Sequence, residues 1–360
     1  MIPTPARTPV RLRLLGLALA ACAAGSTPGW AKPPADPVVD RQTGDRLLIT
    51  WRSDQPVDVL VADRPDAAVA TATMVSPRDG DGRAEVAAPD QGRRYVILRN
   101  TATGELTRVA ERLIPLEAGS NFRDIGGYPA AGGKHVKWGL IYRSGATPLI
   151  TAADQGRLAA LGLANLVDLR SDEERQLAPS RIDGVPTTAV GYTMGRMMGT
   201  GADMAMDKVY ARLPETMAPQ LRQIFAKLLR REGPLAYNCS AGQDRTGFVT
   251  AVVLSALGTP YPDIVADYHL STAYRRPQFE MPRLNAAQFP DNPVVALFAR
   301  FQDDPRLAMP QPLKTADGKA YLDFAFAELE RKWGGVDGYL RQELHLTDAD
   351  MAQLRGEYTE

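Results

Sequence analysis

The segment from Pro234 to Gly258 constrains the fold more than any other part of this 360-residue sequence. A short apolar run, PLAYNC, leads into the polar loop SAGQDR, and the apolar run TGFVTAVVLSALG follows. This order predicts a buried strand, a tight turn and a helix that ends at Gly258. Because ligands of α/β sheets bind beyond the carboxyl ends of the strands, we expect the loop to be a binding site.

Strand-like and helix-like runs alternate around this segment. HVKWGLIYRS and LANLVDLRS have the apolar pattern of strands, and the run between them predicts a helix. In that helix Thr151 is the expected N-cap, Asp154 the acid of a capping box and Gly162 the C-cap. An amphipathic helix is predicted over ETMAPQLRQIFAKLLRREG, with its end at Gly233. We therefore expect residues 116–360 to form an α/β fold with a largely parallel central sheet flanked by helices.

Residues 38–115 have a different pattern, in which short alternating runs are separated by turn signals. The runs are RLLITW, VDVLVA, ATATMV, RAEVA, RYVILR and RVAERL. Short strands at this spacing predict a small all-β, sandwich-like domain. It contains no catalytic pattern, so we interpret it as a packing or spacer module that follows the proline-rich tether KPPADP.

Residues 1–31 have the pattern of a signal peptide. Three arginines precede the apolar run LLGLALAACAAG, which is too short to span a membrane as a mature helix. Two cleavage sites remain open: LAAC resembles a lipobox, in which Cys22 is acylated, and GWA ends at Ala31 like an ordinary signal peptidase site. Both predict export, to the periplasm or the medium, with membrane contact only through a lipid anchor on Cys22.

The balance of charge indicates no nucleic-acid partner. The 42 Lys and Arg residues cancel the 42 Asp and Glu residues, and aromatic residues make up only 7% of the chain. The chain therefore offers neither a basic field for phosphate backbones nor an obvious platform on which bases could stack.

Cys239 is one of only two cysteines in the sequence. Once Cys22 is acylated or removed, Cys239 has no disulfide partner, so it is either buried and inert or a reactive thiol. Cysteine titrates near pH ~8.5, but in electropositive sites its pKa falls to roughly 3.5 to 7.5. A thiolate at the head of this loop is the interpretation that the neighbouring residues favour.

The loop has the composition of an anion site. The backbone N–H groups at the start of a helix lack partners and carry the positive end of its dipole. Gly242 permits a backbone conformation that other residues resist, and Arg245 offers a planar fork to two phosphate oxygens. We expect the inward-facing amides to come from Ser240, Ala241, Gly242 and Gln243.

A thiolate beneath a bound phosphate indicates one reaction. Cys239 attacks phosphorus, and water then hydrolyses the phosphocysteine. Thr246 could hydrogen-bond the thiolate and ease its departure. The leaving ester oxygen needs a proton, and Asp244 is the nearest acid. Whether Asp244 is this acid or only orients Arg245 remains open at this point.

The nonapeptide CSAGQDRTG fits the C-x5-R signature of the protein tyrosine phosphatase superfamily. It resembles the C-x-x-G-x-D-R-T-G form of bacterial tyrosine and dual-specificity phosphatases and of phosphoinositide phosphatases. The runs NFRDIGGY, IYRSG, LVDLRSDEE and VADYHLS are similar to successive blocks of the bacterial family that includes a secreted mycobacterial tyrosine phosphatase. The resemblance implies a phosphomonoesterase without metal or cofactor, acting on phosphorylated proteins or phosphoinositides.

The resemblance also implies roles for single residues. Cys239 would be the nucleophile, Asp244 the acid, and Arg245 with the loop amides the phosphate site. Asp168 and Arg170 would support the loop, either as a structural salt bridge or through direct chemistry.

Three positions depart from the family pattern. Asn238 replaces the usual histidine and adds no charge, and Gln243 replaces a lysine that phosphoinositide-competent relatives often carry. Some relatives take the acid from the segment after the DLR strand, where this chain has Asp203 and Asp207, but their placement is poor and favours Asp244. The methionines of that segment predict either a mobile lid over the loop or a loop packed on the core.

Other classes of function fit less well. A cysteine protease needs a histidine base, and none of His135, His269 and His345 lies in a protease context. No cluster of Cys, His and carboxylates has metal-ligand spacing. A rhodanese-like sulfur carrier shares the cysteine loop, although DRTG indicates phosphate. A module that binds phosphorylated ligands without turnover stays open as the second hypothesis.

Overall fold

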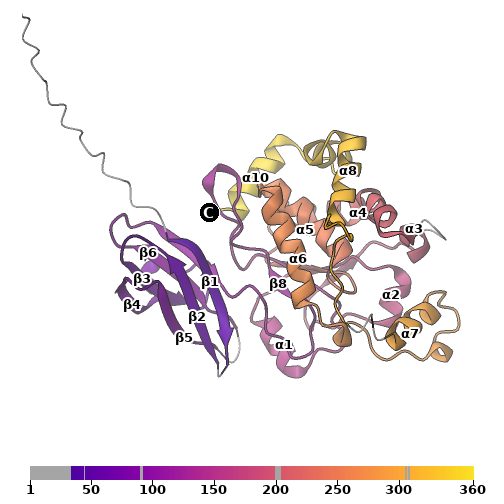
Figure 1. Cartoon of the computed structure of the whole chain (residues 1–360), viewed down its shortest axis with the longest axis horizontal. Helices are drawn as coiled ribbons and strands as arrows, with labels where there is room; N and C mark the ends of the chain where they lie inside the picture. Colours follow the sequence, from indigo (N-terminus) through magenta and orange to yellow (C-terminus); the bar gives the residue numbers. More distant parts are fainter. Residues whose placement is uncertain (1–33, 44, 90–91, 199–203, 305, 307–308) are drawn as a thin grey trace, which may run out of the picture.

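The computed structural model describes residues 34–43, 45–89, 92–198, 204–304, 306 and 309–360. The expectation of a mixed α/β fold is confirmed, and Figure 1 shows a group of antiparallel strands beside a sheet with helices around it. The predicted signal peptide at 1–31 lies outside the described residues. Among the described helices, none combines the length and the apolar character needed to cross a membrane.

Two antiparallel sheets make up the N-terminal part. One has the order β1-β2-β5 and the other β4-β3-β6-β7. Their strands are β1 (Ala35–Gln42), β2 (Arg46–Arg52), β3 (Val57–Ala62), β4 (Thr73–Asp79), β5 (Arg83–Ala87), β6 (Tyr95–Asn100) and β7 (Leu106–Ala110). Alternate residues of both sheets, such as Ile49 and Val96, share one buried apolar cluster.

The strand pattern was wrong at two places. Residues 35–37 of the expected tether belong to β1, because the chain pairs with β2 from Ala35 onward despite its prolines. The run ATATMV is not one strand, since Val69–Thr71 form a 3-10 turn before β4 begins at Thr73.

A five-stranded sheet carries the loop. Its order is β11-β10-β12-β9-β8. The strands are β8 (Arg123–Asp124), β9 (Ile141–Ser144), β10 (Asn165–Asp168), β11 (Thr187–Ala189) and β12 (Leu235–Asn238). The four strands β11, β10, β12 and β9 run parallel, whereas β8 is antiparallel to β9. Strand β12 is therefore internal, and its carboxyl end lies between those of β9 and β10.

Helices surround this sheet. They are α1 (Ala152–Ala159), α2 (Asp172–Leu177), α3 (Met194–Met198), α4 (Met206–Leu229), α5 (Asp244–Leu257), α6 (Tyr261–Tyr274), α7 (Val295–Asp303), α8 (Leu322–Trp333), α9 (Val336–Gly338) and α10 (Asp348–Tyr358). The capping box of Thr151 and Asp154 is confirmed, but α1 ends earlier than expected, with Ala160 rather than Gly162 as its C-cap. Helix α5 ends as predicted, with Gly258 in the left-handed conformation.

Helix α4 is longer than the sequence pattern predicts. It begins at Met206 rather than Glu215, continues through Pro214 and Pro219, and ends at Leu229 rather than at Gly233. A proline removes one backbone hydrogen bond from a helix. Here the buried face of α4, which includes Leu213 and Met217, packs into the main apolar cluster and holds the helix together.

Helix α5 sits at the centre of the main core. All but two of its residues, Asp244 and Ser255, are buried, and it packs against α4, α6 and α10. Figure 1 shows α5 and α6 side by side in front of the sheet. A helix that is apolar on every side is stable only when it is covered on every side. This packing fixes the N-terminus of α5 at the carboxyl end of β12.

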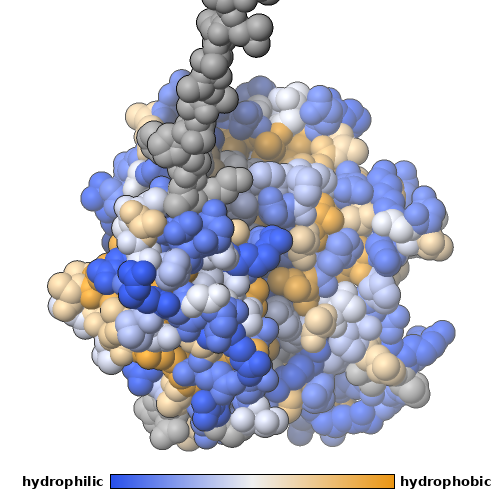
Figure 2. Space-filling view, turned by 60° about the vertical axis from the view of Figure 1, so that its left-hand side comes forward, coloured by the Kyte–Doolittle hydropathy of each residue, from blue (hydrophilic) through white to orange (hydrophobic). Residues whose placement is uncertain are grey.

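One buried ion pair joins the antiparallel strands to the rest of the chain. The guanidinium of Arg93, just before β6, donates to Asp124 at 2.6 Å and to the hydroxyl of Tyr142 at 3.2 Å. Both charged side chains are buried. The indole N–H of Trp138 donates to the carbonyl of Arg108 across the same junction. Elsewhere, the face in Figure 2 has hydrophilic and hydrophobic residues interspersed.

Candidate active site

The loop between β12 and α5 forms a tight turn that requires glycine at Gly242. Gly242 has φ of +67°, and a Cβ at this position would lie 2.6 Å from the backbone nitrogen of Gly145. A side chain is therefore excluded both by its conformation and by the neighbouring backbone. The predicted need for glycine has a second cause, the close approach to Ser144 and Gly145, that the sequence does not show.

The carbonyl groups of the loop are held outward. The side-chain amide of Asn121 donates to the carbonyl of Gly242 at 2.8 Å, and Arg143 donates to the same oxygen at 2.9 Å. The backbone N–H of Ala146 donates to the carbonyl of Ser240. In the part of the chain that the structure describes, the backbone N–H groups of residues 240–245 donate to no acceptor. A row of free donors at a helix N-terminus is suited to an anion.

A buried carboxylate supports the two residues that hold these carbonyls. Asp267 of α6 pairs with Arg143 and Arg123, and Arg123 in turn contacts Asn121. Burial alone would raise the pKa of the Asp267 carboxyl, but the charges of Arg123 and Arg143 lower it well below its usual range. Three sequence blocks, NFRDIGGY, IYRSG and VADYHLS, meet in this network.

Cys239 lies at the base of the loop and is 2% exposed. Its backbone N–H donates to the hydroxyl of Thr246 at 2.8 Å, and that hydroxyl lies 3.5 Å from the carbonyl of Ser144. Thr246 therefore ties the two ends of the loop together in this structure. Cys239 is a free thiol.

Arg245 is held by Glu174, a residue to which the sequence analysis gave no role. Its two terminal nitrogens donate to the Glu174 carboxylate at 2.5 and 2.7 Å, and one also donates to the hydroxyl of Tyr192 at 2.8 Å. Glu174 further accepts from the hydroxyl of Ser240 at 2.5 Å and closes a capping box with Ser171.

The pKa of Glu174 reflects these contacts. Burial raises it, but the charge of Arg245 and the hydrogen bonds from Arg245, Ser240 and Ser171 lower the pKa to about 2. Glu174 therefore stays charged at neutral pH. The S-x-x-E pattern in LVDLRSDEE was the signal that could have identified it, although only as a helix cap.

Asp244 begins α5 and is partly exposed beside the loop. One of its carboxylate oxygens accepts from the hydroxyl of Tyr210 at 2.5 Å, and that hydroxyl lies 2.6 Å from the hydroxyl of Tyr268. No hydrogen bond joins Asp244 to Arg245 among the described residues; the guanidinium of Arg245 donates to Glu174 and Tyr192 instead.

The supporting residues lie around the loop. Asp168 and Arg170 form a buried ion pair at 2.6 Å, and Asp168 pairs with Asn238 in the register of β10 and β12. Arg170 also donates to the carbonyl of Ala178 and so anchors the end of α2. Neither side chain hydrogen-bonds to the loop among the described residues.

Asn238 and Gln243, two of the three departures from the family pattern, each have a hydrogen-bond partner. Asn238 donates to the carbonyl of Cys239 at 3.3 Å. The side-chain oxygen of Gln243 accepts from Arg275 at 2.8 Å, and Arg275 also forms an ion pair with Glu280. An arginine thus lies beside the loop position at which lysine was missing.

The methionine-rich segment is divided between the core and the undescribed residues. Met194 and Met197 are buried in the main apolar cluster, and Asp207 lies in the first turn of α4. Asp203 lies outside the described residues. Met204 is 41% exposed, so part of the described segment packs on the core and part does not.

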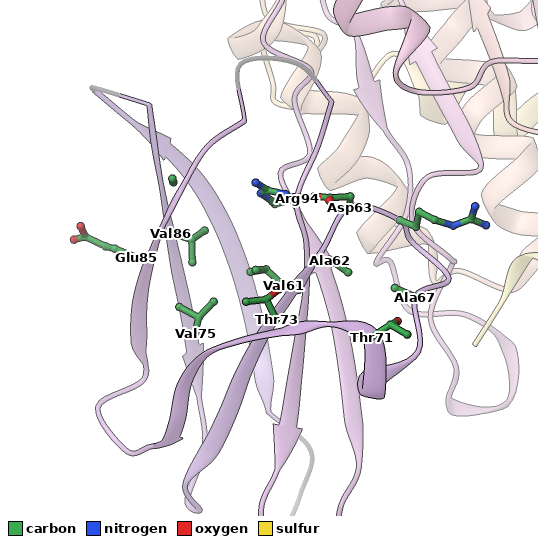
Figure 3. A pocket seen from close by; sticks show the side chains of 12 residues that line it. Val61, Ala62, Asp63, Ala67, Thr71, Thr73, Val75, Glu85, Val86 and Arg94 are labelled. Atoms are coloured by element: carbon green, nitrogen blue, oxygen red, sulfur yellow. Dashed lines mark hydrogen bonds and ion pairs between the residues drawn. The ribbon is translucent and has the colours of Figure 1, made fainter.

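Two cavities of about 560 Å³ lie elsewhere. Figure 3 shows one of them, lined by β3, β4 and β5, with Asp63 and Arg94 at one end. The other lies at the far end of α5, where Thr259 and Asp323 contribute to its wall. Neither is lined by a residue of the loop, so the loop is identified by its chemistry rather than by the size of a cavity. The described residues contain no group of three or more His, Cys, Asp or Glu side chains arranged to hold a metal ion.

Comparison with known proteins gives matches over the same part of the chain. Residues 114–360 match the model of the family described as "Tyrosine phosphatase family". A Cupriavidus necator protein, provisionally named a tyrosine-protein phosphatase, is 35% identical over 257 residues, which cover 66% of this chain and 85% of that protein.

Two further relatives are more distant. A tyrosine-protein phosphatase of Nostoc commune is 26% identical, with 57% of this chain and 69% of that protein covered. A triple specificity protein phosphatase of Mycobacterium tuberculosis is 25% identical, with 66% and 95% covered. Among solved structures, that of P. aeruginosa TpbA in complex with pTyr is 19% identical in sequence and has a TM-score of 0.22. The match covers 42% of this chain and 78% of the TpbA chain.

Proposed function

Because this chain belongs to the tyrosine phosphatase family and is a cysteine-dependent protein phosphatase, we propose that Cys239 is its nucleophile and Arg245 its phosphate-binding arginine. The observation that carries this assignment is the loop itself. Outward carbonyls, free amides and a buried guanidinium surround one thiol at the carboxyl end of an internal strand. Such an arrangement favours a bound phosphate directly above sulfur.

The first step forms a bond between sulfur and phosphorus. The Cys239 thiolate attacks the phosphate monoester, the bond to the ester oxygen breaks, and Asp244 donates a proton to that oxygen. In the second step water attacks phosphorus, gives a proton to Asp244 and releases the thiolate. The loop amides and Arg245 bind the phosphoryl oxygens in both steps.

The contacts of Arg245 support Asp244 as the acid. The alternative role for Asp244 was to orient Arg245, but Glu174 already does so with two hydrogen bonds. Asp244 is instead partly exposed at the loop, where a leaving oxygen can reach it.

Hydrolysis of para-nitrophenyl phosphate tests the nucleophile. Cys239→Ser should abolish turnover and retain binding of vanadate or phosphate, because the amides and Arg245 are unchanged. Binding without turnover in the unmodified protein would instead support the second hypothesis, a module that captures phosphorylated ligands.

The family match supports a proposal for the substrate class. We propose phosphorylated tyrosine in proteins as the main substrate, with phosphoserine, phosphothreonine and phosphoinositides as alternatives. Arg275 is bonded to Gln243 but also paired with Glu280, so it adds little net charge for a polyphosphorylated head group. A screen of phosphopeptides and phosphoinositides, with Cys239→Ser as the control, separates these classes.

Two further proposals concern the rest of the chain. Residues 38–115 form a sandwich-like domain and residues 116–360 the catalytic domain. The apolar cluster of the N-terminal strands supports this division, since among its buried members only Trp138 lies beyond residue 115. Residues 1–31 direct export to the periplasm or the medium. The mass of the mature N-terminus decides between acylation at Cys22 and cleavage after Ala31, and an unprocessed cytoplasmic chain would contradict export.

A further inference from the structure

Three helices meet at Asp244 through a chain of hydroxyl groups. Tyr210 from α4 contacts the first residue of α5 at 2.5 Å, and Tyr268 from α6 contacts Tyr210 at 2.6 Å. Both tyrosines are buried, and their rings meet edge to face with centroids 6.4 Å apart. Such a buried pair of hydroxyls, aimed at one carboxyl group, is not needed to fill the core, because phenylalanine would fill the same volume.

The direction of the hydrogen bonds follows from their end point. A carboxylate only accepts, so Tyr210 donates to Asp244, and its oxygen then accepts from Tyr268. Burial raises the pKa of Tyr210 and of Tyr268 well above the usual range, and the nearby charge of Asp244 adds to this effect. Both hydroxyls therefore keep their protons throughout the pH range of the reaction.

Close packing keeps this chain in place. A Cβ at Gly247, one turn into α5, would lie 2.8 Å from the ring of Tyr268, so glycine lets α6 approach the start of α5. The ring of Tyr321 packs against that of Tyr210, with centroids 5.8 Å apart. The hydroxyl of Tyr210 is thus fixed relative to the loop by neighbours on three sides.

We propose that Tyr210, backed by Tyr268, is a positioning residue for the proton transfer from Asp244. Tyr210 holds one carboxyl oxygen of Asp244, so that the other oxygen, which carries the proton, faces the ester oxygen that leaves. As the bond between this proton and Asp244 breaks and its bond to the ester oxygen forms, negative charge develops on the carboxylate. The hydrogen bond from Tyr210 stabilises that charge. This inference rests on the proposed role of Asp244 as the acid.

The other charged groups near Asp244 are few. Arg275, which follows α6, acts on Asp244 through its charge, and Arg143 of β9 acts on Tyr268. Among the described residues, the ring of Tyr321 packs against that of Tyr210, and the titratable ring of His269 lies with its centroid 5.3 Å from that of Tyr268. These groups are unchanged in a Tyr210→Phe variant, so its effect reports the lost hydroxyl.

The experiment compares leaving groups in Tyr210→Phe. With phenyl phosphate, whose leaving group needs the proton, kcat should fall roughly tenfold, the size of one hydrogen bond to a charged group. With para-nitrophenyl phosphate, whose leaving group needs it less, kcat should change less than about twofold. The alkaline limb of the pH profile of kcat should move to higher pH, because a hydrogen bond that favours the charged carboxylate is lost.

Tyr339→Phe is the matched control. Tyr339 is as buried as Tyr210 and donates to the carbonyl of Pro214 at 2.6 Å, away from Asp244. It should lose stability without any dependence on the leaving group. Tyr268→Phe should shift the same two readouts as Tyr210→Phe but by a smaller factor, and it provides a second test if Tyr210→Phe does not fold.

A double-mutant cycle that combines Tyr210→Phe with Asp244→Asn completes the test. In that background Tyr210→Phe should have no further effect on the leaving-group dependence. The positioning role alone would be overturned if Tyr210→Phe slowed both substrates equally. It would also be overturned if Tyr210→Phe, like the control Tyr339→Phe, lost stability without any dependence on the leaving group. If Asp244→Asn shows no leaving-group dependence, the assignment of the acid fails and the positioning role falls with it.

Discussion

Glu174 and Arg245 form a buried ion pair with two hydrogen bonds, in which the carboxylate of α2 fixes the arginine that follows the loop between β12 and α5. Glu174 also accepts from Ser240, so one carboxylate reaches both ends of the loop. Removing one partner of a buried pair leaves an uncompensated charge and costs about 3–5 kcal/mol. The loop should therefore depend on Glu174 for its shape as much as on its own residues.

The ion pair predicts a particular dependence of stability on pH. The pKa of Glu174 is about 2 in the folded protein, against a reference value of 4.5, so its stabilising contribution is complete above pH 4.5 and is lost as pH falls toward 2. The contribution is roughly 3 kcal/mol. Urea unfolding of the wild type and Glu174→Gln should show a constant difference between pH 7 and 5 that shrinks by pH 3. A difference that grows on acidification would contradict the pairing.

Asp244→Asn should slow substrates with poor leaving groups far more than those with good ones. Loss of a general acid costs about 10²–10⁴-fold, and only a poor leaving group needs the full contribution. The ratio of kcat for phenyl phosphate to kcat for para-nitrophenyl phosphate measures the effect. Equal slowing of both substrates would return Asp244 to a structural role.

Asp267→Asn should weaken the hydrogen bonds that fix the carbonyl of Gly242 in the loop between β12 and α5. Asp267 pairs with Arg123 and Arg143, which hold the outward carbonyl of Gly242 directly or through Asn121. Two buried guanidinium groups would lose their counter-charge, so we expect a loss of about 3–5 kcal/mol in the free energy of unfolding and weaker phosphate binding. Denaturant melts and phosphate inhibition constants measure the two effects. Asp304→Asn, which breaks an exposed pair with Arg306, is the control and should change neither.

Gly242→Ala should abolish the loop geometry, whereas Gly162→Ala should not. Both glycines have positive φ, +67° and +63°, but an added Cβ at Gly242 meets backbone at 2.6 Å and one at Gly162 meets nothing within 4 Å. Gly162→Ala should cost only the conformational strain, about 1 kcal/mol. Gly242→Ala should in addition lower kcat/KM by at least about 100-fold, since the amides no longer converge. Similar activity in the two variants would mean that the contact with Gly145 is unimportant.

Arg93→Leu should weaken the packing of the antiparallel strands against the central sheet and lower the free energy of unfolding, while kcat stays unchanged. The variant leaves the buried Asp124 carboxylate with two backbone N–H donors but without its charged partner, which costs about 3–5 kcal/mol. Arg93→Leu combined with Asp124→Asn should recover part of that loss. Thermal and urea melts measure stability, while kcat at low temperature should stay close to that of the wild type. A large fall in kcat at full folding would indicate that the junction reaches the loop.

Local pattern was enough to predict the elements that carry the loop. The strand before Cys239, the helix that ends at Gly258 and the capping box of Thr151 follow from neighbouring residues, and the structure has all three. The start of α4 could not be predicted in this way, because burial of its apolar face outweighs the effect of Pro214 inside it.

The nonapeptide around Cys239 indicated the chemistry because the proposed nucleophile, the proposed anion-binding amides and the arginine are close together in the chain. The partners that hold those groups are not consecutive. Glu174 reaches Arg245 from α2, Asp267 acts from α6, and Tyr210 reaches Asp244 from α4. Contacts between residues so far apart in sequence leave no periodicity to detect, and they exist only after the helices have packed against the sheet. Contacts between residues close in sequence could therefore be predicted from the order of amino acids. The positions of the charged side chains around the thiol depend instead on packing between residues far apart in sequence.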